Sequence, residues 1–253
     1  MSDPGPRPAV PRAPTAAVVI IGDEILTGKF RDENSPWLID RCRDLGIDLR
    51  RLAIVPDLVE RIADEVATCS AAFDWVFTTG GVGPTHDDVT MAGIARGLGL
   101  CLERREELVE VLRERMPEHL TEDALRMADL PQGAALWWEG DIFFPQVVAR
   151  NVVIFPGVPS LLRLKFDAVA HRFGGQPALS LRLVTTLPES RIAAPLRQAQ
   201  ERWPQVHIGS YPRFEQRPHT VMVILDGRDA GPLAACHAWL AEVLAGHLVE
   251  PGD

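Results

Sequence analysis

The run from Thr79 to Thr90, TGGVGPTHDDVT, combines glycines that can surround a phosphate with carboxylates that can hold a metal ion. Three glycines stand within four residues, and two aspartates follow side by side. Glycine lets the backbone approach a ligand closely and turn its N–H groups toward it. Carboxylate oxygens suit a divalent cation that bridges phosphate oxygens. The run therefore predicts chemistry on a phosphorylated ligand, without the Gly-Lys-Ser/Thr of a Walker loop.

A plainer interpretation of this run is a glycine-rich turn with Asp88 as the cap of the next helix. A turn alone needs neither three glycines nor two adjacent aspartates, so we favour ligand binding. We predict Asp87, Asp88 and His86 as catalytic residues, and Asp23, Asp87 and Asp88 as ligands of a divalent metal. His86 would polarise a phosphate or position water, and a plain surface histidine is the alternative.

Three further segments are expected beside this run, because ligands of open α/β sheets bind beyond the carboxyl ends of the strands. The first, Gly22-Asp23-Glu24, leaves the first apolar run. The second is Asp32-Glu33-Asn34, and the third is Pro156-Gly157-Val158-Pro159 after another apolar run. Loop residues, a helix cap and a tight turn are the respective alternatives. Gathered at one edge, the acidic residues would favour a divalent metal.

The elements that would position these segments follow from hydrophobic patterning. Residues 16–22 form a continuous apolar run that suits a strand buried on both faces. Alternating strands and helices follow, which predicts an α/β fold with a parallel sheet covered on both faces. Ser35 is the expected N-cap of the first helix, with Pro36 at its first position. The predicted strands are 16–22, 49–55 and 75–78, and the predicted helices are 36–45 and 58–69.

The rest of the chain predicts the end of this domain and a second, smaller one. A charged helix is expected over 103–115, short strands over 135–138, 147–150 and 152–155, and a helix over 161–173. A linker at 174–177 separates this first domain from the second. The second has a predicted β-α-β-β-α order, which is typical of a small ferredoxin-like α+β sandwich. The predicted boundaries are a disordered tail at 1–14, a first domain at 15–174 and a second at 178–250.

Composition excludes several classes of protein. With 35 acidic against 26 basic residues the net charge is −9, which argues against a nucleic-acid-binding surface. No apolar run approaches the ~20 residues of a membrane helix, so no membrane partner is expected. The four cysteines are scattered, which indicates reduced thiols in a cytoplasmic protein and no zinc site.

Taken together, the segments at 22–26, 32–34, 79–90 and 156–159 resemble the MoaB/Mog domain, also known as the molybdopterin-binding domain. The resemblance is closest to the CinA (competence/damage-inducible protein A) branch and to the amino-terminal domain of eukaryotic FAD synthase, which shares the Gly-Ser-Tyr-Pro turn at 209–212. It covers residues 15–250. It implies a three-layer, mostly parallel sheet followed by the smaller α+β domain.

This resemblance also implies a function. Its members act on or hold small phosphorylated ligands, here ADP-ribose, FAD or molybdopterin, with Mg²⁺, Mn²⁺ or Co²⁺. It implies metal-dependent hydrolysis of a nucleotide diphosphate by a homo-oligomer. The alternatives are a molybdopterin-binding or adenylylating protein of molybdenum cofactor biosynthesis and a non-catalytic nucleotide-binding module. The implied ligand-binding residues are Gly22, Asp32, Asn34, Thr79, Gly80, Gly81, Gly83, Thr85, Gly157 and Pro159.

The chain departs from the family pattern in two places. Ser160-Leu161 stands where many members have Glu after the last proline, and residues 124–128, ALRMA, replace an Asn-x-x-Gln-Ala box. Both departures bear on substrate choice and on turnover. No segment resembles the deamidase domain of full CinA or the FAD-forming domain of FAD synthase, so neither activity is expected.

Overall fold

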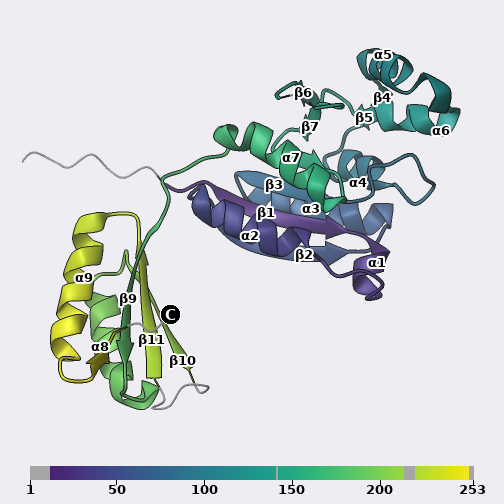
Figure 1. Ribbon diagram of the computed structural model, residues 1–253. Helices are drawn as coiled ribbons and strands as arrows, with labels where there is room; N and C mark the ends of the chain where they lie inside the picture. Colours follow the sequence, from purple (N-terminus) through teal and green to yellow (C-terminus); the bar gives the residue numbers. More distant parts are fainter. Residues whose placement is uncertain (1–11, 141, 214–219, 251–253) are drawn as a thin grey trace, which may run out of the picture. The chain divides into compact units, whose positions relative to one another are not determined.

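The computed structural model describes residues 12–140, 142–213 and 220–250 (Figure 1). The described part of the chain divides into two compact units, 13–175 and 176–250. The tail predicted over 1–14 lies outside the described residues, apart from its last three. Each unit is described below by itself.

The larger unit contains a six-stranded sheet in the order β2-β1-β3-β8-β7-β6. The first four strands of this order run parallel, and β7 and β6 are antiparallel to their neighbours. A parallel pair needs a crossover, and helices supply it between the parallel strands. The strands are β1 (Thr15–Ile21), β2 (Asp48–Val55), β3 (Trp75–Thr79), β6 (Ala135–Trp137), β7 (Gln146–Ala149) and β8 (Val152–Phe155).

Helices cover both faces of this sheet, so the predicted three-layer α/β fold is confirmed (Figure 1). Alternate residues of β1 enter opposite cores: Val18 packs with α2 and α7, and Val19 packs with α3 and α4. Both cores are apolar, which fixes the register of the central strand. The helices are α2 (Asn34–Asp44), α3 (Val59–Ala72), α4 (Thr90–Gly97) and α7 (Pro159–Val169).

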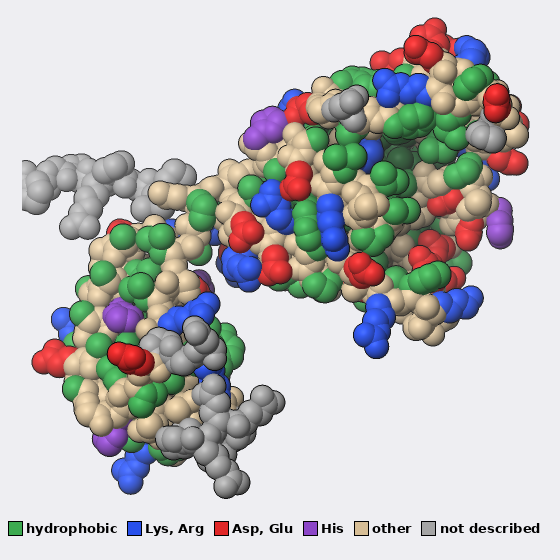
Figure 2. All heavy atoms as spheres, in the orientation of Figure 1, with side chains coloured by type: hydrophobic (Ala, Val, Ile, Leu, Met, Phe, Trp, Pro, Cys, Tyr) green, Lys and Arg blue, Asp and Glu red, His purple; other side chains and the backbone are tan. Residues whose placement is uncertain are grey.

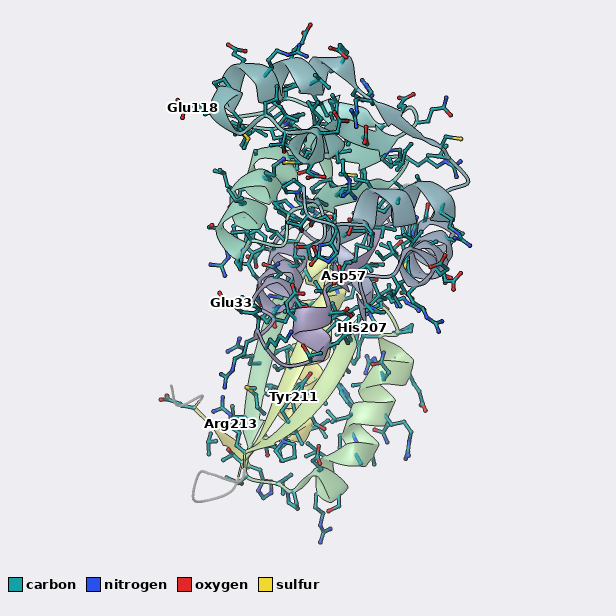
Figure 3. All side chains as sticks on the ribbon, turned by 90° about the vertical axis from the view of Figure 1, so that its right-hand side faces the viewer. Glu33, Asp57, Glu118, His207, Tyr211 and Arg213 are labelled. Atoms are coloured by element: carbon teal, nitrogen blue, oxygen red, sulfur yellow. The ribbon has the colours of Figure 1, made fainter. Side chains whose placement is uncertain are left out.

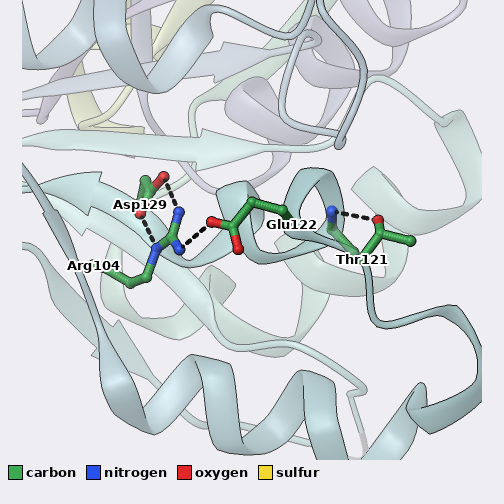
Figure 4. Close-up of polar contacts among 5 residues, drawn as sticks. Arg104, Thr121, Glu122 and Asp129 are labelled. Carbon is green, nitrogen blue, oxygen red and sulfur yellow. Dashed lines mark hydrogen bonds and ion pairs between the residues drawn. The ribbon is translucent and has the colours of Figure 1, made fainter.

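An excursion between α4 and β6 differs from the prediction. The helix expected over 103–115 is wrong at its start, because residues Leu102–Arg104 form strand β4 and pair with β5 (Asp129–Pro131). Helices α5 (Glu106–Arg115) and α6 (Glu122–Leu125) follow β4. The guanidinium of Arg104 reaches both Asp129, at 2.7 Å, and Glu122, at 2.7 Å (Figure 4). This long-range pairing overrides the local helical pattern.

The smaller unit has the predicted β-α-β-β-α order and one further short strand. Its antiparallel sheet is ordered β10-β11-β9-β12, and α8 and α9 share one core with it. Val223 and Leu225 of β11 are fully buried in that core. The elements are β9 (Leu179–Thr185), α8 (Glu189–Arg202), β10 (His207–Arg213), β11 (Thr220–Gly227), α9 (Ala230–Val243) and β12 (Leu248–Val249).

Two further expectations concern the membrane and the thiols. Among the residues that the structure describes, no helix is long and apolar enough to span a bilayer. The four cysteines are free. Burial raises the pKa of the Cys42 thiol and of the Cys69 thiol to about 12, so both stay protonated at neutral pH.

Candidate functional site

Four parallel strands end at one edge of the large sheet, and the predicted site residues follow those ends. The backbone N–H of Gly22, after β1, donates to the carbonyl of Val55 in β2 at 3.2 Å. The N–H of Gly80, after β3, donates to the carbonyl of Phe155 in β8 at 3.3 Å. Figure 3 looks onto this edge, with Asp57 near its centre.

Close packing explains why glycines follow β3. Gly80 has a φ of +107°, and a Cβ there would lie 2.0 Å from the carbonyl oxygen of Ile21. Gly81 has a φ of +60°, and its Cβ would lie 2.5 Å from the hydroxyl of Thr90. Side chains at either position would be strained and would clash. The hydroxyl of Thr90 donates to the carbonyl of Gly80 at 2.8 Å and holds the turn against α4.

Past Gly83 the loop is closed by its own side chains. The N–H of Thr85 donates to Oδ2 of Asp88 at 2.8 Å, and the Thr85 hydroxyl lies 2.6 Å from both Asp87 Oδ1 and Asp88 Oδ2. Asp88 therefore closes the loop and does not cap α4, whose N-cap is Val89. The hydrogen bond from Thr85 lowers the pKa of Asp87 below its ordinary value. His86 is fully solvent-exposed, its side chain 96% accessible.

Asn34 joins three of the predicted segments. It is buried, and its amide donates to the carbonyl of Gly157 at 2.8 Å and to the hydroxyl of Thr79 at 3.2 Å. The Thr79 hydroxyl donates in turn to the carbonyl of Pro156 at 2.8 Å. The Oδ1 atom of Asn34 is buried and has no hydrogen-bond partner among the described residues. A buried acceptor of this kind is costly unless a ligand or water satisfies it.

Asp32, two residues before Asn34, accepts hydrogen bonds from the first residues of α2. Its Oδ1 accepts the backbone N–H groups of Asn34, at 2.9 Å, and Ser35, at 3.0 Å, and its Oδ2 accepts the Ser35 hydroxyl. The predicted N-cap at Ser35 is wrong: α2 begins at Asn34, and Asp32 satisfies its first free donors. Pro159, the other helix-start residue of the set, opens α7.

One acidic residue of this edge was missed by sequence reasoning. Asp57 follows the end of β2, accepts the backbone N–H of Asp23 at 2.8 Å, and lies 3.3 Å from where a Cβ of Gly81 would stand. Burial raises the pKa of Asp57, and the charges of Glu24, Asp23 and Asp87 raise it further. The carboxylate of Asp57 therefore lies in the combined electrostatic field of acidic residues from two other loops, the one at 23–24 and the one at 87.

The predicted metal ligands do not form a ready metal centre. Within the described part of the chain, no group of three or more His, Cys, Asp or Glu side chains is arranged to hold an ion. Asp88 is turned into its own loop, and Asp87 is bonded to Thr85. Asp23 lies at the start of the four-residue helix α1 (Asp23–Leu26). The described residues therefore assemble the glycine loop beside several carboxylates, but no preassembled ion site occurs among them.

The surface is hollowed in two places beside the glycine loop. Figure 2 shows acidic and basic side chains interspersed over the visible face of the larger unit. The smaller hollow, about 90 Å³, is lined by Gly81 and Gly83. The larger, about 500 Å³, is lined by Thr85. Both are bounded on the opposite side by Arg126 and Met127, which follow α6. Both residues belong to the segment 124–128 that replaces the Asn-x-x-Gln-Ala box of the family, although neither was predicted as a site residue.

Several predicted site residues thus fall into two groups. Asn34 contacts both Thr79 and Gly157 directly, and Gly80 packs closely against Ile21 and Gly157. Thr85, His86, Asp87 and Asp88 form the exposed tip of the same loop.

Comparison with known families separates the two units. The family model described as "Probable molybdopterin binding domain" matches residues 17–179. The model described as "FAD synthase, middle domain" matches residues 177–253.

Individual relatives agree with these matches. A "Probable FAD synthase" of Caenorhabditis elegans is 33% identical over 96% of this chain and 52% of its own length. A "CinA-like protein" of Anaeromyxobacter dehalogenans is 35% identical over 76% of this chain and 53% of its own length. The chain thus spans about half of each relative. The crystal structure of CinA from Thermoplasma acidophilum, whose function is described as unknown, matches 64% of this chain and 98% of its own with a TM-score of 0.59 at 27% identity.

Proposed function

The chain belongs to the family of probable molybdopterin-binding domains, in its CinA-like and FAD synthase-like branch, and we propose that its larger unit hydrolyses a nucleotide diphosphate such as ADP-ribose or FAD in a metal-dependent reaction. The reaction cleaves the P–O–P anhydride by adding water, which releases AMP and a second monophosphate.

One observation carries this proposal: the carboxylate of Asp57 lies against Gly81, in the glycine loop. The loop offers backbone N–H groups of the kind that hold phosphate oxygens. The neighbouring carboxylates repel a bare diphosphate, as they already oppose the ionisation of Asp57. A diphosphate that arrives as its complex with a divalent cation avoids this repulsion. We therefore treat the metal–nucleotide complex as the substrate, which accords with the absence of a preassembled ion site in the described residues.

Asp57 and Asp87 have different roles in this proposal. Asp57 has a raised pKa and suits the acceptance of a proton from the attacking water, because a stronger base accepts a proton more readily. Asp87 has a lowered pKa and stays ionised beside the exposed His86, which suits it to attract the cation that accompanies the diphosphate. Buried Asn34 keeps one oxygen free for a hydroxyl donor of the ligand.

The direct test is incubation of the purified protein with ADP-ribose or FAD and Mg²⁺, Mn²⁺ or Co²⁺, with release of AMP as the readout. Asp87→Ala should lower the rate by at least 10-fold while the thermal midpoint stays within about 2 °C of wild type. Asp40→Ala is the matched control, since Asp40 is an exposed aspartate on α2 that pairs with Arg43. No AMP with any of the three metals, from folded protein, would refute hydrolysis.

The family match over 17–179 favours molybdopterin binding or adenylylation as a second candidate. Mass spectrometry of the protein purified under native conditions separates the two, because a retained pterin supports the second candidate alone. Light scattering of the same sample tests the homo-oligomer that the resemblance implies.

A further inference from the structure

The 500 Å³ hollow beside the loop is not used by the proposed chemistry. One wall is the tip of the glycine loop, and the other is the segment from α5 to β5. Its chemically informative lining residues are Thr85, His86, Met116, Asp123, Arg126 and Met127. The smaller hollow, bounded by the same Arg126 and Met127, reaches Gly81 and Gly83. The two hollows therefore share a wall at Arg126 and Met127, and both lie between the glycine loop and the segment that follows α6.

Arg126 is the cation of this hollow whose donors are open. It is exposed, and no hydrogen bond or ion pair to its guanidinium occurs within the described residues. By contrast, Arg104 is held by Asp129 and Glu122, and Arg105 donates to the carbonyl of Ala134 at 2.8 Å. An unpaired guanidinium presents a planar fork that matches phosphate oxygens. Asp123 adds one opposing charge to the wall.

The wall that carries Arg126 is firmly positioned. Thr121 caps α6 by accepting the N–H of Ala124 at 3.1 Å, and Arg104 ties α6 to β5 through Glu122 and Asp129 (Figure 4). A preorganised wall loses little entropy when a ligand binds, so it can contribute to affinity.

The rest of the lining suits an extended organic group. Met116 and Met127 are half-buried and face the hollow from the same wall. Their thioethers are polarisable and make favourable contacts with aromatic rings. A volume of about 500 Å³ falls in the range of sites for small organic ligands.

We infer that this hollow binds the distal half of the nucleotide diphosphate, with Arg126 pairing the phosphate farther from Gly81 and the two methionines contacting the group attached to it. The inference rests on the proposed function and adds a specificity element to it. A mononucleotide such as AMP reaches only the glycine loop. ADP-ribose and FAD carry a second phosphate and an attached group that reach the larger hollow, where Arg126 pairs that second phosphate.

Calorimetric titration with AMP, ADP-ribose and FAD, each with Mg²⁺, tests this inference. Arg126→Ala should weaken binding of ADP-ribose and FAD by at least 10-fold and of AMP by less than 3-fold. Arg126→Lys should recover part of the loss, because it restores the charge without the fork. Arg113→Ala is the matched control: Arg113 is an exposed arginine of α5 that is absent from the lining, and its loss should change no affinity by more than 3-fold.

The outcomes separate the inference from the function on which it rests. If wild type binds the diphosphates and Arg126→Ala binds them equally well, or weakens AMP to the same extent, the inference is wrong and the proposed function stands. If wild type binds none of the three nucleotides, both are overturned. A selective loss for the two diphosphates that Arg113→Ala does not reproduce supports the inference.

Discussion

The side-chain amide of Asn34 donates to the carbonyl of Gly157 at 2.8 Å and so joins residues 123 positions apart in the chain. The bond links the start of α2 to the turn after β8. Its other hydrogen, donated to Thr79, adds the end of β3. One buried side chain therefore sets the spacing of three loops at the candidate site.

Asn34→Ala should lower the free energy of unfolding by about 1–3 kcal/mol, because it leaves buried groups without their donor. It should also abolish measurable ligand binding. Urea unfolding and calorimetry measure the two effects. Asn151→Ala is the matched control, since Asn151 donates to the carbonyls of Ser70 and Phe73 away from this edge. It should lose similar stability and keep its affinity, and an equal loss of affinity would contradict a site role for Asn34.

Gly80→Ala should be among the most damaging single changes in the larger unit. The added Cβ would lie 2.0 Å from the carbonyl oxygen of Ile21, at a φ of +107°. We expect a loss of about 3 kcal/mol or more, the range of severe steric and backbone effects. Gly99→Ala measures the cost of the positive φ alone, because Gly99 also has a positive φ but has open space around it. It should cost about 1 kcal/mol. Thermal unfolding that ranks the two equally would contradict the close packing.

Asp57→Asn should stabilise the protein at neutral pH. The fold holds the Asp57 proton more tightly than the unfolded chain does, so the free energy of unfolding falls as pH rises through the raised pKa. Asn at this position does not ionise, so the variant does not lose stability as the pH rises. Its side-chain oxygen can still accept the backbone N–H of Asp23. We expect a gain of up to about 1 kcal/mol at pH 7 that vanishes below about pH 4.

The control for this pH dependence is Asp40→Asn, which removes an equally negative side chain paired with Arg43. It should show no gain at any pH. Urea unfolding at pH 4 and pH 7 gives the comparison. A gain for Asp57→Asn that persists unchanged at pH 4 would show that charge is not its cause.

Much of the fold could be predicted from local pattern, because β1 is apolar on both sides and the strands and helices alternate. Asp57 was missed although the rule that selected Asp23 applies to it, since both directly follow a strand end. Its sequence context, Val55-Pro56-Asp57, resembles an ordinary turn. The wall that carries Arg126 could not be predicted, because strand β4 forms only through its pairing with β5, and local charge patterning indicates a helix there.

The pairing of β8 with β3 sets an order of events during synthesis. When the ribosome has released residues up to Asp57, or even up to Thr90, the amide of Asn34 has no carbonyl of Gly157 to meet. The site is complete only after residues up to Pro159 have been synthesised. A nascent chain that stalls earlier carries the acidic loops and Asn34, but it lacks the Gly157 carbonyl to which Asn34 donates.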